Sequence, residues 1–72
     1  MVRMRFYNGR GLMTSVMYFE DSRDGFWLLK NTLWLYVRHG WSIIGYEDDF
    51  EAAAVSAWNG KELYLSYVGG GG

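Results

Sequence analysis

The chain contains no cysteine and one histidine, and this limits how a domain of its length can hold its fold together. Its 72 residues suffice for one domain, and a chain this short buries roughly 60% of the surface that its unfolded form exposes. Disulfides and thiolate or imidazole metal clusters, which support many small domains, are not open to this sequence. It has instead four Trp, six Tyr and four Phe. Because each large ring can bury about 150–250 Å², we expect rings to supply much of the core.

The N-terminal segment predicts a β-hairpin. In residues 2–7, with the sequence VRMRFY, apolar side chains alternate with arginine and tyrosine, as in a strand with one buried face. Asn8 and Gly9 follow directly, and both tolerate the positive φ of a tight hairpin turn. Gly11 allows a bulge beyond the turn, and residues 12–19 then pair back as the second strand.

Residues 26–39 predict an amphipathic helix. Apolar side chains recur at the spacing i, i+3, i+7, i+10 and i+11, which places them on one face. This core face consists of Phe26, Leu29, Leu33, Tyr36 and Val37. Ser22 or Asp24 is placed to cap the first turn by accepting hydrogen bonds from its free amides. Gly40 is placed to end the helix in the left-handed conformation.

A strand over residues 41–47 is expected after this helix. A second interpretation stays open, because periodicity over short apolar runs does not separate helix from strand. In that interpretation, residues 33–37 and 41–46 form a hairpin that turns at His39 and Gly40. We favour the helix.

Residues 48–58 predict a second helix, in which alanine favours the helical state. Asp48 and Glu51 form an acidic variant of the capping box at its start. Its apolar face consists of Phe50, Ala53, Ala54, Ala57 and Trp58.

The end of this helix also has two interpretations. Asn59 and Gly60 either close it as a C-cap, which we prefer, or turn a hairpin between residues 52–58 and 61–68. In both cases residues 61–68 alternate as the last strand. One domain is therefore expected over residues 1–68, an α+β fold in which a small mixed four-stranded sheet packs on one main helix in the order ββαβ(α)β.

Charge and hydropathy exclude several classes of partner. The formal net charge of −1 gives no general attraction to a polyanion or to an anionic bilayer. The longest uncharged apolar runs are far too short to span a membrane. We expect a soluble cytoplasmic protein without a membrane partner.

Side chains able to carry chemistry do not form a catalytic or metal-binding pattern. The acidic clusters at residues 20–24 and 47–51 lack the alternating ligands and glycine of a calcium loop, and helix capping or solvated loop charge explains them. His39 has no serine in a nucleophile elbow as a partner, and no glycine-rich phosphate motif is present. We expect no catalytic residue, metal or cofactor, and we do not expect an enzyme.

The strongest functional indication lies on the first predicted helix, outside its core face. Trp27 and Trp34 are seven positions apart, and so are Leu28 and Leu35 on a different side. One face of a small sheet does not cover a helix that is apolar nearly all round. The second helix and residues 20–25 offer an alternative cover. We expect some of these four side chains to be exposed and the surface to bind another protein or a second copy of the chain, since Trp is enriched at binding hot spots.

The first predicted hairpin offers a different surface. Arg3, Arg5 and Tyr7 share its outer face, and Arg10 lies in its turn. Basic strands with interleaved aromatic residues bind single-stranded nucleic acid through phosphate contacts and base stacking. Three arginines are few, and the net charge opposes the encounter, so this hypothesis ranks below protein binding.

The chain ends in YVGGGG, and the glycines at residues 69–72 form a flexible tail without side chains to pack. The element order, the strand LYLSYV over residues 63–68 and the terminal Gly71 and Gly72 resemble the ubiquitin-like β-grasp family. This resemblance implies a ubiquitin-like modifier or sulfur carrier, in which Gly72 is activated by an enzyme and Gly71 threads its channel. Polyglycine is also typical of an inert linker.

Overall fold

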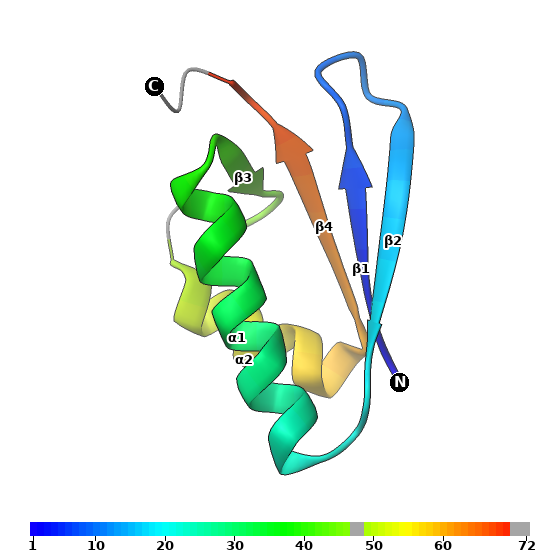
Figure 1. Cartoon of the computed structure of the whole chain (residues 1–72), viewed down its shortest axis with the longest axis vertical. Coiled ribbons are helices and arrows are strands. Elements are labelled where there is room, and N and C mark those ends of the chain that lie inside the picture. Colours follow the sequence, from blue (N-terminus) through cyan, green and yellow to red (C-terminus); the bar gives the residue numbers. More distant parts are fainter. Residues whose placement is uncertain (47–48, 70–72) are drawn as a thin grey trace.

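The computed structural model describes residues 1–46 and 49–69. Within them, four strands and two helices follow one another as β1, β2, α1, β3, α2 and β4. Their bounds are β1 Val2–Tyr7, β2 Met13–Phe19, α1 Arg23–Arg38, β3 Trp41–Ile43, α2 Phe50–Gly60 and β4 Glu62–Tyr67. The strands form one sheet, and both helices lie on the same side of it (Figure 1).

The strand order in the sheet is β2-β1-β4-β3. β1 pairs antiparallel with β2 and parallel with β4, and β3 pairs antiparallel with β4. β1 and β4 are therefore neighbours at the centre, and α1 carries the chain from one edge of the sheet to the other. This confirms the predicted α+β fold, with a mixed four-stranded sheet in a β-grasp-like order.

The β1–β2 hairpin has both predicted strands but a longer turn than predicted. The side-chain oxygen of Asn8 accepts hydrogen bonds from the amides of Arg10 at 2.8 Å and Leu12 at 3.1 Å. The loop therefore runs from Asn8 to Leu12, and Gly11 takes a left-handed φ of 81° within it. The bulge lies in the β1–β2 ladder just before this loop, not at Gly11.

The helix predicted over residues 26–39 is confirmed, and the alternative hairpin is wrong. α1 begins three residues earlier than predicted because Ser22 caps it: the Ser22 hydroxyl accepts a hydrogen bond from the amide of Gly25 at 3.0 Å. Gly25 packs so closely on the preceding loop that a Cβ atom there would overlap the carbonyl oxygen of Glu20. Gly40 follows the helix with a φ of 92°, as predicted.

β3 is shorter than the strand predicted over residues 41–47. It ends at Ile43, and a turn follows in which Gly45 has a φ of 93°. Ile44 still donates its amide hydrogen to the carbonyl of Tyr64 at 2.9 Å, after which the chain leaves the sheet. The end of the predicted strand lies outside the described residues.

α2 is a helix, so the alternative hairpin between residues 52–58 and 61–68 is wrong. Its N-cap is Asp49, whose carboxylate accepts a hydrogen bond from the amide of Ala52 at 3.1 Å. The predicted cap, Asp48, lies outside the described residues. At the other end the left-handed residue is Lys61, with a φ of 68°, and the helix continues through the predicted cap at Gly60.

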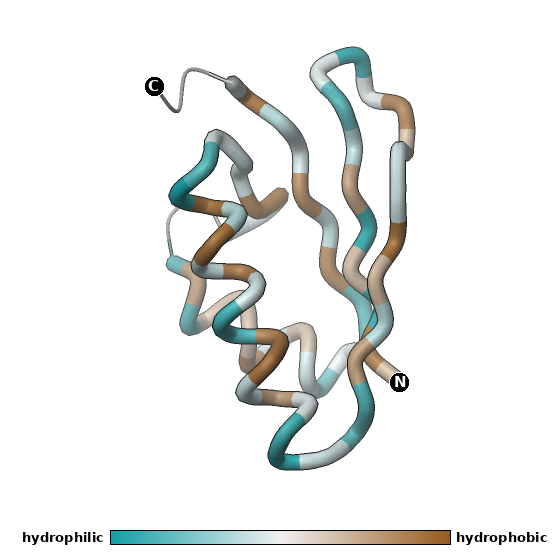
Figure 2. Tube along the Cα trace, viewed as in Figure 1, coloured by the Kyte–Doolittle hydropathy of each residue, from teal (hydrophilic) through white to brown (hydrophobic). Residues whose placement is uncertain are grey.

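The core lies between the sheet and the two helices. Its buried apolar residues, drawn from all six elements, are Val2, Met4, Phe6, Phe19, Leu29, Leu33, Ile43, Ala53, Ala54, Ala57, Leu63 and Leu65. Two of them, Phe6 and Phe19, are aromatic and are the largest fully buried side chains, and six further rings pack against this cluster, so rings contribute more at the margin of the core than at its centre. Most rings, such as Tyr36, Trp41 and Trp58, are partly buried around its margin. Figure 2 shows apolar and polar residues alternating along β1 and β4, as the pleat of a sheet with one covered face requires.

Candidate protein-interaction surface

α1 buries one side against the core and leaves the opposite side open. Leu29 and Leu33 are fully buried, whereas the exposed fractions of Trp27, Leu28, Trp34 and Leu35 are 57%, 58%, 45% and 50%. The prediction that some of these four side chains are exposed is confirmed, and it holds for all four. α2 and residues 20–25 flank them without covering them. The exposed side also carries three polar residues, and we call the whole set the outer face of α1: Asp24, Trp27, Leu28, Asn31, Trp34, Leu35 and Arg38.

The outer face has three parallel rows, because an α-helix has about 3.6 residues per turn and seven residues make nearly two turns. Trp27 and Trp34, the Trp pair, form one row. Leu28 and Leu35, the Leu pair, form another. The third, the polar row, runs between the pairs and consists of Asp24, Asn31 and Arg38. The sequence pattern indicated the two apolar pairs but not the polar row between them.

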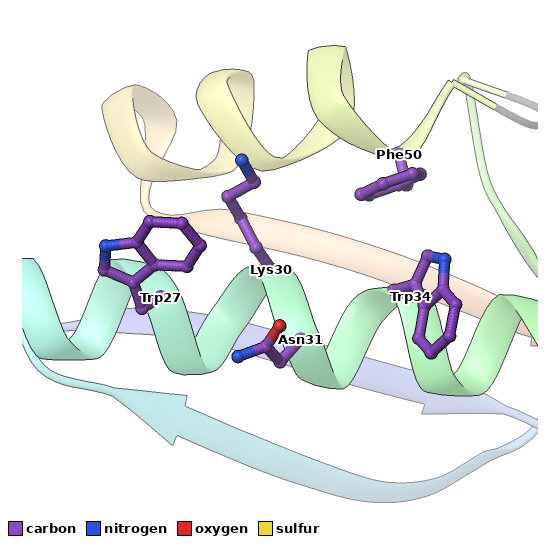
Figure 3. Close-up of a pocket in the computed structure, with 5 residues that line it drawn as sticks. All are labelled: Trp27, Lys30, Asn31, Trp34 and Phe50. Carbon is purple, nitrogen blue, oxygen red and sulfur yellow. The ribbon is translucent and has the colours of Figure 1, made fainter.

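A groove runs beside the Trp pair, between α1 and α2. It has a volume of about 340 Å³ and is lined by Trp27, Lys30, Asn31 and Trp34 from α1 and Phe50 from α2. Figure 3 shows the two indoles at opposite ends, with Phe50 facing Trp34 from α2 and Lys30 reaching between the helices. The sequence pattern predicted that Phe50 lies on the apolar face of its helix. It did not indicate that Phe50 also lines the groove between α1 and α2.

Each indole of the Trp pair lies against a cation. The Lys30 Nζ atom is 5.3 Å from the Trp27 ring centroid and 3.2 Å from the Glu51 carboxylate, so it links the two helices. The Arg38 guanidinium carbon is 4.4 Å from the Trp34 ring centroid. Such cation–π contacts contribute about 0.5–1 kcal/mol at exposed sites. They also hold the two rings in defined orientations on the surface.

A second hollow, of about 250 Å³, lies at the C-terminal end of α1 and is lined by Leu35, Tyr36, His39 and Trp41. The His39 Nδ1 atom is 2.7 Å from the carbonyl oxygen of Leu35. Because a carbonyl oxygen accepts hydrogen bonds, Nδ1 is the protonated nitrogen. His39 therefore donates a hydrogen bond to a carbonyl at the end of the helix, and within the described chain no serine hydroxyl is bonded to its ring.

The acidic loop before α1 is tied into the fold. Lys61 donates a hydrogen bond to Asp21 at 2.7 Å, and this bond is the main reason that the pKa of Asp21 lies below its ordinary value. Glu20 and Asp24 are exposed.

Across residues 1–46 and 49–69, no group of three or more His, Asp or Glu side chains is placed to hold a metal ion.

The first hairpin places its arginines beside a carboxylate. Arg5 donates a hydrogen bond to Glu62 of β4 at 2.6 Å, and Arg3 lies 3.2 Å from the same carboxylate. The bond from Arg5 is the main cause of a lowered pKa at Glu62, and it raises the pKa of Arg5. A phosphate would have to compete with Glu62 for both arginines. Tyr7 lies on the same face, and Arg10 is exposed in the loop. Nucleic-acid binding by this hairpin thus stays a prediction, and the contact of both arginines with Glu62 opposes it.

After β4, Val68 and Gly69 lie beside the C-terminal end of α1. The amides of Val68 and Gly69 both donate hydrogen bonds to the carbonyl oxygen of Gly40, at 2.9 and 3.1 Å. Gly72, the activated residue of the carrier hypothesis, and Gly71, the residue that would thread the enzyme, lie outside the described residues.

Three comparisons with known proteins find no match for this chain, whether among family models, curated proteins or solved structures. In the described part of the chain, neither helix has the length and apolar character needed to cross a membrane.

Proposed function

We propose that this protein is a small non-enzymatic interaction module that binds another protein, or a second copy of itself, through the outer face of α1. The observation that carries the proposal is that the hydrophobic core forms without any side chain of this outer face. Leu29 and Leu33 are fully buried, while the Trp and Leu pairs keep about half of their surface in water. Apolar groups that the fold leaves open are available to a partner.

The Trp pair is large enough to supply the centre of an interface. Half of a Trp side chain is on the order of 100 Å², and burial of apolar surface contributes about 25 cal/mol per Å². Each indole can therefore contribute about 2.5 kcal/mol to binding. Lys30 and Arg38 contact the two rings, so part of the side-chain freedom of the indoles is already restricted before association.

The shape of the surface favours a macromolecule over a small ligand. The outer face is the convex side of a sixteen-residue helix, and the hollows on its flanks are open grooves between side chains. A second helix packs well against such a surface, since its side-chain ridges enter grooves of this kind. Tryptophan and arginine, which occur together here, are the residue types most enriched at binding hot spots.

Site-specific photo-crosslinking tests this proposal. A photoreactive residue replaces Leu28 or Leu35, and matched controls carry it at Val55 of α2 and Tyr18 of β2, which are about equally exposed. The purified chain and a lysate of cells that express it are both irradiated. We expect protein adducts from the α1 positions at several times the control yield, and we expect Trp34→Ala to suppress them. Equal yields at all four positions would contradict the proposal.

A ubiquitin-like carrier is the second candidate, and the strand order favours it. β1 and β4 lie parallel at the centre of the sheet, as the resemblance to the ubiquitin-like β-grasp family implies. In this function Gly72 is the residue activated and Gly71 the residue that threads the enzyme. The test is incubation with ATP in the same lysate, beside a chain that lacks Gly72. An ATP-dependent mass increase confined to the intact chain supports this candidate, and its absence from both chains removes it.

A further inference from the structure

The apolar rows on the outer face of α1 are symmetric about Asn31. Trp27 and Leu35 lie four positions to either side of Asn31, and Leu28 and Trp34 lie three positions to either side. Reversing the helix therefore exchanges each indole with a leucine at the same distance from the centre. Because the second copy also turns its face toward the first, an antiparallel pair sets the Trp pair of one copy beside the Trp pair of the other, with Trp27 next to Trp34, and the Leu pair beside the Leu pair.

The charges of the polar row obey the same symmetry with opposite signs. Asp24 lies in the first turn of α1 and Arg38 in the last, each seven positions from Asn31. In an antiparallel pair Asp24 faces Arg38 of the second copy, at both ends of the contact. A parallel pair would set Asp24 against Asp24 and Arg38 against Arg38, which like-charge repulsion opposes. Among the ion pairs of the described residues, none involves Asp24 or Arg38.

We propose that the partner of this face is a second copy of the chain, bound antiparallel with a two-fold axis at Asn31. This inference rests on the proposed function of the outer face and names its partner. A two-fold interface uses the same patch on both copies, so every contact is made twice. The antiparallel arrangement also brings the positive end of each helix dipole beside the negative end of the other.

The spacing of the rows suits close contact along the whole helix. Side chains that repeat every seven residues stay in register between helices that cross at about 20°. Asp24 and Arg38 lie about 21 Å apart along α1, at a rise of 1.5 Å per residue, and a shallow crossing keeps both ends in contact. In Figure 1 α1 forms the outer layer on its side of the molecule, with α2 at its flank rather than over its outer face.

Asn31 lies where the two helices come closest. Its amide group both donates and accepts hydrogen bonds, so two copies of the same side chain can bond to each other across the axis. A polar residue inside an apolar helix contact costs some affinity and fixes the register. A shift along the helix would leave both amides unpaired against apolar side chains.

The size of the contact sets the expected strength. A standard interface covers about 800 Å² on each partner, roughly a sixth of the 4697 Å² surface of this protein. One helix face reaches about that area with few contacts beyond it. The dimer is therefore expected to form reversibly, in the micromolar to millimolar range.

Sedimentation of the purified chain from about 1 μM to about 1 mM, the range expected for a contact of this size, tests the dimer. We expect a shift from monomer to dimer. Trp34→Ala should raise its dissociation constant by about 100-fold or more, because a hot spot is lost twice. Val55→Ala and Tyr18→Ala, equally exposed elsewhere, should leave it unchanged. A chain that stays monomeric up to the highest concentration overturns the inference.

Charge reversal tests the antiparallel arrangement. Asp24→Arg and Arg38→Asp should each raise the dissociation constant by about 10-fold, since two attractive pairs become repulsive. Combining the two substitutions in one chain should restore the original value. In a parallel dimer neither single substitution would weaken association and the combination would restore nothing, so that result also overturns the inference. Circular dichroism checks that each variant remains folded.

Cysteine crosslinking locates the axis, and the chain has no cysteine of its own to interfere. Asn31→Cys should form an intermolecular disulfide under mild oxidation, whereas Asp24→Cys should form one only when mixed with Arg38→Cys. Efficient linkage of Asp24→Cys to Asp24→Cys of a second copy contradicts the antiparallel dimer. If the chain is monomeric but crosslinks from Leu28 still capture another protein in the lysate, the dimer fails and the proposed function stands. If crosslinks from α1 match the controls in both samples, both fail.

Discussion

The outer face of α1 and the open face of the sheet are both exposed, and both combine arginine with aromatic rings. On the sheet, Arg5 lies against the Tyr64 ring and donates a hydrogen bond to Glu62 at 2.6 Å. On α1, Arg38 stacks on Trp34 at 4.4 Å, and within residues 1–46 and 49–69 it has no carboxylate partner. The sheet face satisfies its charges internally, whereas the helix face presents its cation and its rings to solvent.

This difference has its origin in the topology. β1 lies beside β4, and the parallel register sets Arg3 directly opposite Glu62. The two strands are far apart in sequence, so the ion pairs form only when the sheet closes. The outer face of α1 belongs to one local segment, and no other element supplies it with a counterion or a cover in the described chain. The two faces have similar residue types, arginine and aromatic rings. They differ because only the sheet face gains a carboxylate partner from a distant segment of the chain.

The largest expected effect separates the two sides of α1 itself. Leu33→Ala should lower the free energy of unfolding by about 2–5 kcal/mol, because it opens a cavity in the core. Leu35→Ala, two residues later, should lower it by less than about 1 kcal/mol, because that side chain is half in water. Urea unfolding followed by circular dichroism measures both. Equal losses would mean that the outer face is needed for folding, and the contrast with the sheet would disappear.

Much of this division could be predicted from the sequence, because it depends on local periodicity. The spacing of Leu29 and Leu33 identified the buried side of α1, and the repeat of Trp27 at Trp34 identified the open side. Residues seven positions apart lie on the same side of a helix. Trp27 and Trp34 therefore share one side, which is not the side of Leu29 and Leu33 that faces the sheet.

Other features could not be predicted, because they depend on contacts between distant segments. The pairing of Arg5 with Glu62 requires the β1–β4 register, and the place of Phe50 beside Trp34 requires the packing of α2 on α1. The hydrogen bond that Lys61 donates to Asp21 likewise joins residues 40 positions apart in the sequence.

Removing the carboxylate of the sheet face should have a smaller effect. Glu62→Gln leaves Arg3 and Arg5 side by side without their counterion, so we expect a modest fall in Tm. Glu20→Gln, in the exposed loop before α1, is the matched control and should change Tm less.

Glu62→Gln also tests the difference between the two faces. Once Arg3 and Arg5 are released from Glu62, binding to a single-stranded oligonucleotide should increase in low salt. No change in either measurement would show that Glu62 does not neutralise this face.

The smallest expected effect is a dependence of stability on pH that arises from the sheet side and the loop, not from α1. The pKa of Glu62 is lowered by its hydrogen bond from Arg5, and that of Asp21 by its hydrogen bond from Lys61. A carboxylate whose pKa is lower in the folded state stabilises the fold above its unfolded pKa and loses that contribution as pH falls through the folded value. Stability should therefore be level at neutral pH and decline below the ordinary values of 4.5 for Glu and 3.8 for Asp. Asp21 is exposed and Glu62 is partly exposed, so solvent screening keeps the decline shallow. Thermal unfolding across this range should show a flatter profile for a variant with Glu62→Gln and Asp21→Asn, and an unchanged slope would place the titrating groups elsewhere.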